Sequence, residues 1–280
     1  HKAIRRQRQM CIRDRSGCDV ARRFGKSQGN NGIFLDNREN RVIVVGIFTG
    51  KRVGIIGGFG AYATLDFYGR LLDSFAVESE RDYPNMIIDN VFSMPSRTRA
   101  LLTGGGQTEI VETIVSSMKK ILDYNVDCMV MVCGTAHYFL PYVYEKLPEA
   151  KDKVINILEA TGKHLTANNI DKVLILAAEG TLKQNLYSRT LAGYNIACIE
   201  PEEQYWEEIR YFIECVKQNK YDNELKDRFL RFLGRYDVDN IILGCTEFPL
   251  LLRHIDMGEG IFNFYDPLTY AIHEIHSRIS

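Results

Sequence analysis

The sequence predicts an α/β protein of two pseudo-symmetric, doubly wound lobes. Each lobe is expected to hold a parallel sheet flanked by helices, with the active site in the cleft between the lobes. Short apolar runs alternate with helical patterns along most of the chain, which is typical of parallel sheets. The alternation starts again near the middle of the 280 residues. Because ligands of open parallel sheets bind beyond the carboxyl ends of the strands, two facing lobes would share one cleft.

The first 50 residues are expected to form an extension outside the catalytic fold. Residues 1–28 carry nine Lys and Arg against two Asp and show no apolar periodicity. Residues 33–50 then have the pattern of a hairpin, with a polar turn at 36–40. We expect lobe 1 to span residues 51–151 and lobe 2 to span residues 152–265, with a final helix at 266–280 returning to lobe 1.

The remaining elements follow in chain order. Each expected strand is a short apolar run, and an uninterrupted run such as 128–132 is typical of a strand buried on both faces. The first helix is indicated by Leu65, Tyr68 and Leu71, which recur every three residues. Asp266 before Pro267 is expected to cap the last helix. The expected strands are 53–56, 86–88, 128–132, 173–177, 196–199 and 241–243, and the later helices are 110–122, 182–191, 205–217, 225–232 and 269–280.

The two halves share a spacing that places a cysteine after matching strands. Val126 precedes Cys133 by seven residues, and Val238 precedes Cys245 by the same seven. Cys133 is followed by Gly and Thr, and Cys245 lies between Gly and Thr. A thiolate accepts a proton and a thiol donates one. Two thiols on opposite faces of one carbon would therefore remove a proton from one side and return one on the other.

Composition narrows the function classes. Hydrophobic residues make up 45% and charged residues 25%, which is average for a globular protein. No apolar stretch has the length of a membrane span, and the net charge of −1 argues against a nucleic-acid partner. The seven cysteines include no CxxC pair, and no histidine pair has zinc spacing. We therefore expect cytoplasmic thiols and no metal.

Four segments resemble the aspartate/glutamate racemase family, over roughly residues 51–280. Residues 55–64 are similar to the family's opening glycine loop, and residues 94–98 to its Ile-Pro-Asp-Arg-Thr segment. Residues 133–137 are similar to Cys-Asn-Thr-Ala-His, and residues 243–249 to Gly-Cys-Thr-Glu-Ile-Pro. His137 and Glu247 bring the sequence closer to aspartate racemases than to glutamate racemases.

The resemblance implies a racemase that interconverts L- and D-aspartate, or a related acidic amino acid, without a cofactor. Cys133 and Cys245 would be its two bases, and Arg97 would pair with a substrate carboxylate. The resemblance also implies a homodimer with a small amino acid as its substrate. The other substrate-binding residues that it implies are Gly58, Phe59, Gly60, Gly134, Thr135, Thr181, Thr246 and Glu247.

Three residues depart from the family pattern. Gly134 stands where the family has Asn, and Ser96 where it has Asp. Glu179 lies near the place where some aspartate racemases have a cation. We expect Arg97 to face the cleft and Glu179 to point away, because a carboxylate in the cleft would repel a dicarboxylic substrate.

Two other functions stay open at this stage. Residues 58–63 fit the G-x-G-x-x-A pattern after a strand, and Asp89 ends the next strand, as in an NAD-dependent oxidoreductase. That interpretation leaves the repeated cysteine spacing unexplained. The second alternative is a carboxylate-binding relative without catalytic activity, in which Gly134 marks the loss of activity.

Overall fold

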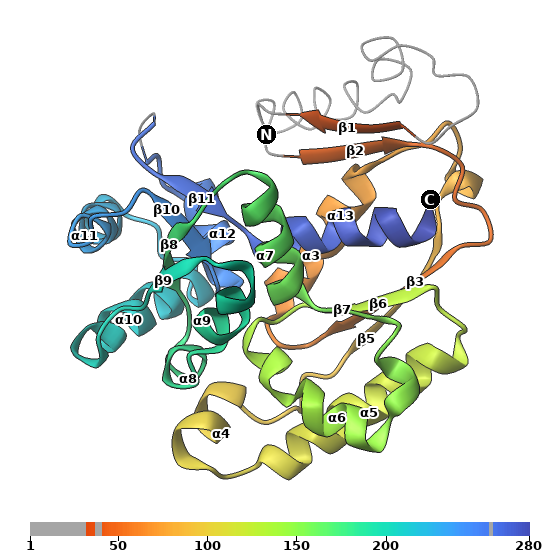
Figure 1. Cartoon of the computed structure of the whole chain (residues 1–280), viewed down its shortest axis with the longest axis horizontal. Helices are drawn as coiled ribbons and strands as arrows, with labels where there is room; N and C mark the ends of the chain where they lie inside the picture. The colour runs from red at the N-terminus through yellow and green to blue at the C-terminus, as the bar shows by residue number, and fades with distance from the viewer. Residues whose placement is uncertain (1–31, 37–40, 258–259) are drawn as a thin grey trace, which may run out of the picture.

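The computed structural model describes residues 32–36, 41–257 and 260–280. The expectation for residues 1–31 lies outside these ranges. The described chain forms two four-stranded sheets and one three-stranded sheet, with helices around them (Figure 1). No helix in these ranges is both long and apolar enough to cross a membrane.

The first four-stranded sheet is parallel and has the order β5-β3-β6-β7. Its central strands are buried because both of their faces are covered, as the apolar runs predict. The strands are β3 (Arg52–Gly57), β5 (Asn85–Asn90), β6 (Cys128–Met131) and β7 (Val154–Ile155). The helices of this half are α3 (Ala61–Asp73), α4 (Arg97–Thr103), α5 (Gln107–Asp123), α6 (Leu140–Lys146) and α7 (Ile157–Ala167), with short 3-10 helices at Glu80–Asp82, Thr135–Phe139 and Pro148–Ala150.

The second four-stranded sheet is also parallel and has the order β11-β10-β8-β9. Its strands are β8 (Lys172–Leu176), β9 (Ala197–Ile199), β10 (Asn240–Leu243) and β11 (Asn263–Tyr265). The helices of this half are α8 (Glu179–Lys183), α9 (Leu186–Leu191), α10 (Trp206–Lys217), α11 (Asn223–Leu233) and α12 (Glu247–His254), with 3-10 helices at Ala192–Tyr194 and Glu203–Tyr205. The last helix of the chain is α13 (Pro267–Ile279).

The two sheets have the same topology. When the strands of each sheet are numbered along the chain, both sheets read 2-1-3-4 across their width. The third strand is β6 in one sheet and β10 in the other, and Cys133 and Cys245 follow these two strands. The predicted pair of related α/β lobes is therefore confirmed.

The C-terminal helix α13 packs against α7, β6 and β7, so it lies on the first lobe. It begins where expected, because the Asp266 carboxylate accepts the backbone N–H of Leu268 at 2.9 Å. Arg70 of α3 donates to the same carboxylate at 2.6 Å. Burial alone would lower the pKa of Arg70, but the charges of Asp266 and Asp66 outweigh it and raise that pKa. The first lobe extends past the expected boundary at 151/152, because β7 pairs with β6 in the first sheet.

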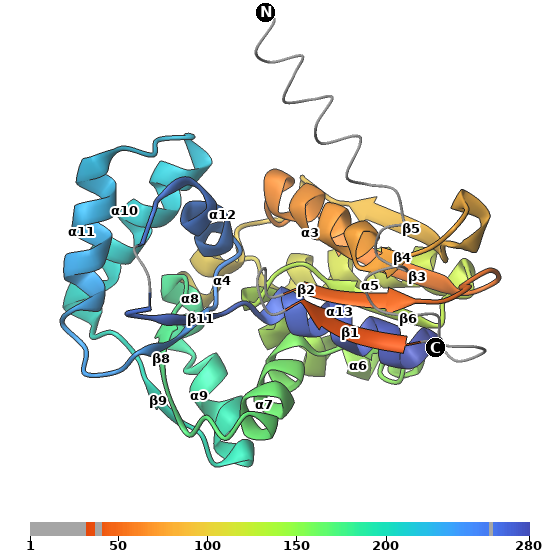
Figure 2. The same ribbon diagram turned by 90° about the horizontal axis from the view of Figure 1, so that it is seen from above.

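The hairpin differs from its expected place outside the catalytic fold. Strand β1 (Gly32–Asp36) pairs antiparallel with β2 (Arg41–Val45), and β2 pairs in parallel with β4 (Phe75–Ala76). Strand β2 lies beside α13 in both views (Figures 1 and 2). Phe48 is fully buried, with its ring centre 4.8 Å from that of Phe75 and 6.0 Å from that of His276. The chain from about residue 43 onward therefore belongs to the core of lobe 1, because Phe48 packs against buried aromatic rings of that lobe.

We predict that Phe48→Ala lowers the free energy of unfolding by about 3–5 kcal/mol, because it leaves a cavity among buried rings. The neighbouring Ile47 is 73% exposed, and Ile47→Ala is the matched control, with an expected change within about 0.5 kcal/mol. Urea unfolding of the full chain measures both. Equal midpoints for the two variants would show that the segment does not contribute to the core.

Candidate active site

Cys133 and Cys245 each lie where a buried strand turns into a helix. The segment after Cys133 enters the 3-10 helix at Thr135–Phe139, and the segment after Cys245 enters α12. Both cysteines carry free thiols, and Cys133 is 9% exposed while Cys245 is half-buried. Strand-end placement thus brings both thiols to the edge where parallel sheets bind ligands.

Both thiols line one cavity of about 230 Å³, called the cysteine cavity below. Residues of both lobes form its wall, so the cavity lies between the lobes, as the sequence predicts. Neither here nor elsewhere in the described ranges is a group of three or more His, Cys, Asp and Glu side chains placed to hold a metal ion. The other lining residues are Phe59, Ser96, Arg97, Thr98, Gly134, Thr135, Ala178, Glu179, Arg210, Ile213, Glu214, Lys217, Gly244, Thr246 and Glu247.

The Cys245 thiol donates a hydrogen bond to the Glu247 carboxylate, with 2.9 Å between sulfur and oxygen. The Thr246 hydroxyl donates to the same oxygen at 3.2 Å. Burial raises the pKa of Cys245 well above its usual value, and the negative charge of Glu247 raises it further. Cys245 therefore rests as a thiol, with a carboxylate that can accept its proton already in contact.

One face of α10 forms a wall of the cavity that the sequence did not indicate. Arg210, Ile213, Glu214 and Lys217 are spaced three, one and three residues apart, so they share a helix face. The Lys217 ammonium lies 2.8 Å from the Glu214 carboxylate. Burial lowers the pKa of Lys217, but the hydrogen bond to Glu214 and the charge of Glu247 more than offset this, so the pKa is raised. Lys217 thus stays positively charged beside the cysteine pair.

Arg97 lines the cavity, in agreement with the expectation. Its guanidinium donates to the carbonyl of Phe59 at 2.9 Å and to that of Pro95 at 3.3 Å. The guanidinium carbon lies 5.0 Å from the centre of the Phe59 ring, within cation–π range. These contacts hold Arg97 against the glycine loop. The Arg97 Nε is buried and has no hydrogen-bond partner in the described ranges.

Glu179 was expected to point away from the cleft, and this expectation is corrected. Glu179 lines the cysteine cavity, and its carboxylate lies 3.3 Å from the guanidinium of Arg210. The position of Glu179 is set by tertiary packing, which the sequence pattern does not show. Helix α8, which begins at Glu179, packs against α4 and so carries the side chain to the cavity.

Three of the residues expected at the site, Gly58, Gly60 and Thr181, are not among the residues that line the cavity. The hydroxyl of Thr181 is hydrogen-bonded to that of Thr135 at 2.8 Å, which joins the two lobes. Gly58 has φ of +85°, and a Cβ there would lie 2.4 Å from the backbone nitrogen of Val91. A Cβ on Gly60 would come within 3.5 Å of the Glu247 carboxylate. These residues shape the loops that carry Phe59, Thr135 and Glu247.

Ser96, which departs from the family's Asp, caps α4 by accepting the Arg99 N–H at 3.3 Å.

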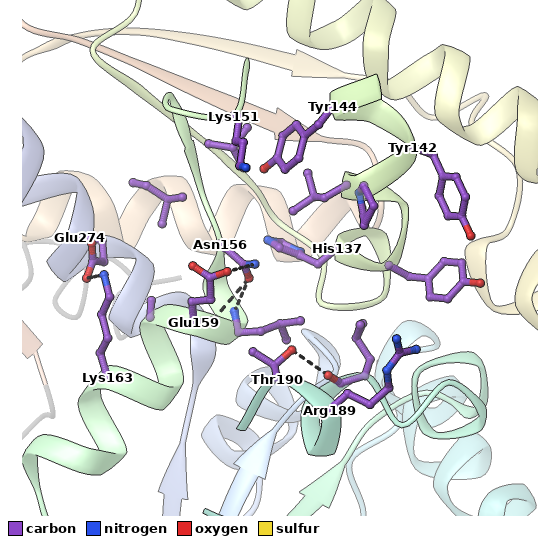
Figure 3. A pocket seen from close by; sticks show the side chains of 18 of the residues that line it. His137, Tyr142, Tyr144, Lys151, Asn156, Glu159, Lys163, Arg189, Thr190 and Glu274 are labelled. Atoms are coloured by element: carbon purple, nitrogen blue, oxygen red, sulfur yellow. Dashed lines mark hydrogen bonds and ion pairs between the residues drawn. The ribbon is translucent and has the colours of Figure 1, made fainter. Parts of the chain in front are cut away.

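His137 faces a second cavity of about 610 Å³ instead of the cysteine cavity (Figure 3). Burial lowers its pKa to about 4, so the ring is neutral at ordinary pH. Its Nε2 accepts the N–H of Ile157 at 3.3 Å, which leaves Nδ1 to donate to the carbonyl of Cys133 at 2.8 Å. His137 therefore ties the Cys133 turn to the start of α7, as a structural brace.

The profile of the Asp/Glu/Hydantoin racemase family matches residues 56–275. This chain belongs to that family. The solved structure of Picrophilus torridus aspartate racemase is 26% identical, with a TM-score of 0.68, and the match covers 82% of this chain and 94% of that one. Francisella tularensis glutamate racemase in complex with D-glutamate shares the fold at 17% identity, with a TM-score of 0.61 over 81% of this chain and 80% of that one.

Curated sequence relatives are glutamate racemases. The Staphylococcus haemolyticus enzyme is 29% identical over 155 residues, which cover 53% of this chain and 56% of the relative. The Sulfurihydrogenibium enzyme is 30% identical over 138 residues, covering 48% of this chain and 51% of the relative. The chain thus spans about half the length of these relatives. The match establishes an isomerase family, with aspartate and glutamate both represented among its racemases.

The two cysteine turns of this racemase-family chain lie in close contact, which explains the glycine at position 134. A Cβ on Gly134 would lie 2.9 Å from the carbonyl oxygen of Gly244 and 3.1 Å from the Tyr187 hydroxyl. A Cβ on Gly244 would lie 2.8 Å from the Tyr187 ring. The buried Tyr187 thus fills the space between the turns, and the Asn that the family pattern has at 134 would not fit without a shift.

We predict that Gly134→Ala lowers the free energy of unfolding by about 1–3 kcal/mol, because the added methyl group pushes the two turns apart. Gly193→Ala is the control, since a Cβ there meets no atom within 4 Å. Urea unfolding curves of both variants make the comparison. If Gly134→Ala is as stable as Gly193→Ala, the turns are not in close contact.

Proposed function

We propose that this chain is a racemase that interconverts L- and D-aspartate without a cofactor, using Cys133 and Cys245 as its two bases. The observation that carries the proposal is the meeting of these two strand-end thiols, one from each lobe, in a single cavity. The repeated topology supports it, because two copies of one turn face the same space from opposite lobes. Family membership supplies the reaction class, and the cysteine pair supplies a way to perform it.

Racemisation at the α-carbon needs one proton acceptor and one proton donor on opposite faces. In the proposed step, the Cys133 thiolate removes the α-proton of one enantiomer, and the Cys245 thiol donates its proton to the other face. The reaction then leaves a Cys133 thiol and a Cys245 thiolate, which is the arrangement needed by the opposite enantiomer. Glu247 accepts a hydrogen bond from the Cys245 sulfur, so it is placed to exchange that proton between turnovers.

Negative charge builds on the substrate as the α-proton leaves. We propose that backbone N–H groups of the turns at Gly134-Thr135 and at Thr246 receive the α-carboxylate and this charge. Both turns line the cavity, and each opens a helical segment whose first N–H groups have no partner within the helix. The site would then stabilise the charge with preorganised dipoles.

The cations of the cavity support a dicarboxylic substrate. Arg97 and Lys217 line it from opposite lobes, and a guanidinium suits a carboxylate particularly well. We propose that these two residues hold the carboxylates of the substrate. Aspartate is favoured over glutamate because the 26%-identical Picrophilus torridus aspartate racemase is matched over 94% of its length. In the same kind of structural comparison, the Francisella tularensis glutamate racemase is matched less closely, at 17% identity over 80% of its length with a TM-score of 0.61.

We also propose a homodimer, as the resemblance implies. Tyr62 and Leu65 are exposed on the same face of α3, which gives a self-association surface some support. A cytoplasmic location, with a free amino acid as the only small-molecule partner, stays a prediction.

We predict that Cys133→Ser and Cys245→Ser each reduce racemisation by about 100-fold or more, because a hydroxyl is too weak an acid to replace a thiol. Cys198→Ser is the control, since Cys198 is half-buried in β9 and lies outside the cavity. Chiral chromatography, started from each enantiomer, gives the rates. Near wild-type racemisation in either active-site variant contradicts the mechanism. Aspartate binding without turnover in the wild type would indicate the non-catalytic alternative.

We predict that Arg97→Ala raises the KM for aspartate by about 10–100-fold, the effect of losing a hydrogen bond between charged groups. Arg99→Ala, two residues along the same helix and exposed, should leave KM within about twofold. Steady-state racemisation assays with both variants provide the comparison. An unchanged KM in Arg97→Ala means that the substrate carboxylate binds elsewhere.

A further inference from the structure

The ion pair between Glu179 and Arg210 places an unexpected charge arrangement at the cavity. Glu179 belongs to α8 and Arg210 to α10, and their charged groups are 3.3 Å apart. The two side chains differ in burial, with 13% of the Glu179 side chain exposed and 55% of that of Arg210. The carboxylate therefore lies in the wall of the cavity, and the guanidinium covers it from the solvent side.

Glu179 has little freedom to leave this position. The next residue, Gly180, is in close contact with α4, since a Cβ on it would lie 2.8 Å from the Cα of Thr98. Thr181 is then hydrogen-bonded across the lobes to Thr135 at 2.8 Å. Both contacts fix the first turn of α8. The fixed turn therefore holds Glu179 at the wall of the cavity.

The other charged groups of the cavity do not offset Glu179. Glu214 is paired with Lys217 at 2.8 Å. Glu247 accepts hydrogen bonds from its two neighbours, Cys245 and Thr246. Arg97 is held against the Phe59 loop on the other lobe. Arg210 is therefore the cation in contact with Glu179.

We propose that Arg210 is a specificity-determining residue, which admits a substrate with a second carboxylate by cancelling the charge of Glu179. This inference rests on the proposed function and names its substrate class. Without Arg210, the Glu179 carboxylate would repel a dicarboxylate at close range, and the cavity would favour an amino acid with a neutral side chain. Arg210 acts through Glu179 and is not a catalytic residue.

A double-mutant cycle separates this role from direct binding of the substrate by Arg210. If Arg210 only cancels Glu179, its loss is harmful while Glu179 is charged and harmless once Glu179 is neutral. If Arg210 binds the substrate itself, its loss is harmful in both backgrounds. Asparagine is the matched ligand, because it has the size of aspartate without the second charge.

The test uses three variants of the full chain, namely Arg210→Gln, Glu179→Gln and the double variant. Arg231→Gln is the control, because Arg231 is exposed on α11 and lies outside the cavity. Calorimetry gives the affinity for aspartate and for asparagine, and racemisation assays give KM and kcat. We expect Arg210→Gln to weaken aspartate binding by about tenfold and asparagine binding by less than about threefold. The double variant should bind aspartate within about threefold of the wild type, and Arg231→Gln should match the wild type.

Two results would overturn the inference. One is an unchanged preference for aspartate over asparagine in Arg210→Gln, and the other is a double variant as weak as Arg210→Gln. The proposed function fails in a different way, through a wild type that binds aspartate and does not racemise it. Calorimetry still reports the preference in that case, so the two failures are distinguishable.

Discussion

The close approach of two cysteine turns is the constraint on which the rest of the site depends. Each turn ends the third strand of its lobe, and the turns meet where Gly134 faces the carbonyl of Gly244. The Tyr187 ring packs into the same place and leaves no room for a side chain on either glycine. Two lobes with one topology, pressed together at this point, present their thiols to a single small cavity. Contacts farther out, such as the Thr135–Thr181 hydrogen bond and the packing of α4 on α8, keep the lobes in that arrangement.

Charge in the cavity is arranged in local pairs. Glu179 forms an ion pair with Arg210, and Glu214 forms one with Lys217. Glu247 accepts a hydrogen bond from the Cys245 thiol. Such pairing limits the cost of holding charges in a partly buried space. It also means that no single strong positive charge in the cavity dominates the attraction of a substrate carboxylate. Its binding depends on which cation can turn from its internal partner toward the ligand, and Arg97, with carbonyl partners only, has no carboxylate to leave.

Much of the fold could be predicted because its signals are local. Apolar runs marked the buried strands, the spacing from Val126 to Cys133 and from Val238 to Cys245 marked the repeat, and Asp266 capped the last helix as expected. The contribution of α10 was missed because helix periodicity shows that residues share a face without showing what that face meets. The same limit applies to Glu179, whose direction depends on how α8 packs on α4, and to Phe48, whose partners come from the far end of the chain.

Deuterium incorporation in the first turnovers tests the central claim most directly, namely that two thiols act on opposite faces of one α-carbon. The wild-type protein is given protiated L-aspartate in heavy water, and the α-position of each enantiomer is followed by mass spectrometry after chiral separation. In the two-thiol account, the proton removed goes to one sulfur, and a deuteron arrives from the other. The D-aspartate formed first should therefore be fully deuterated while the remaining L-aspartate is still protiated. Early D-aspartate that retains the original proton would contradict the account, because a single group would then have moved that proton from one face to the other.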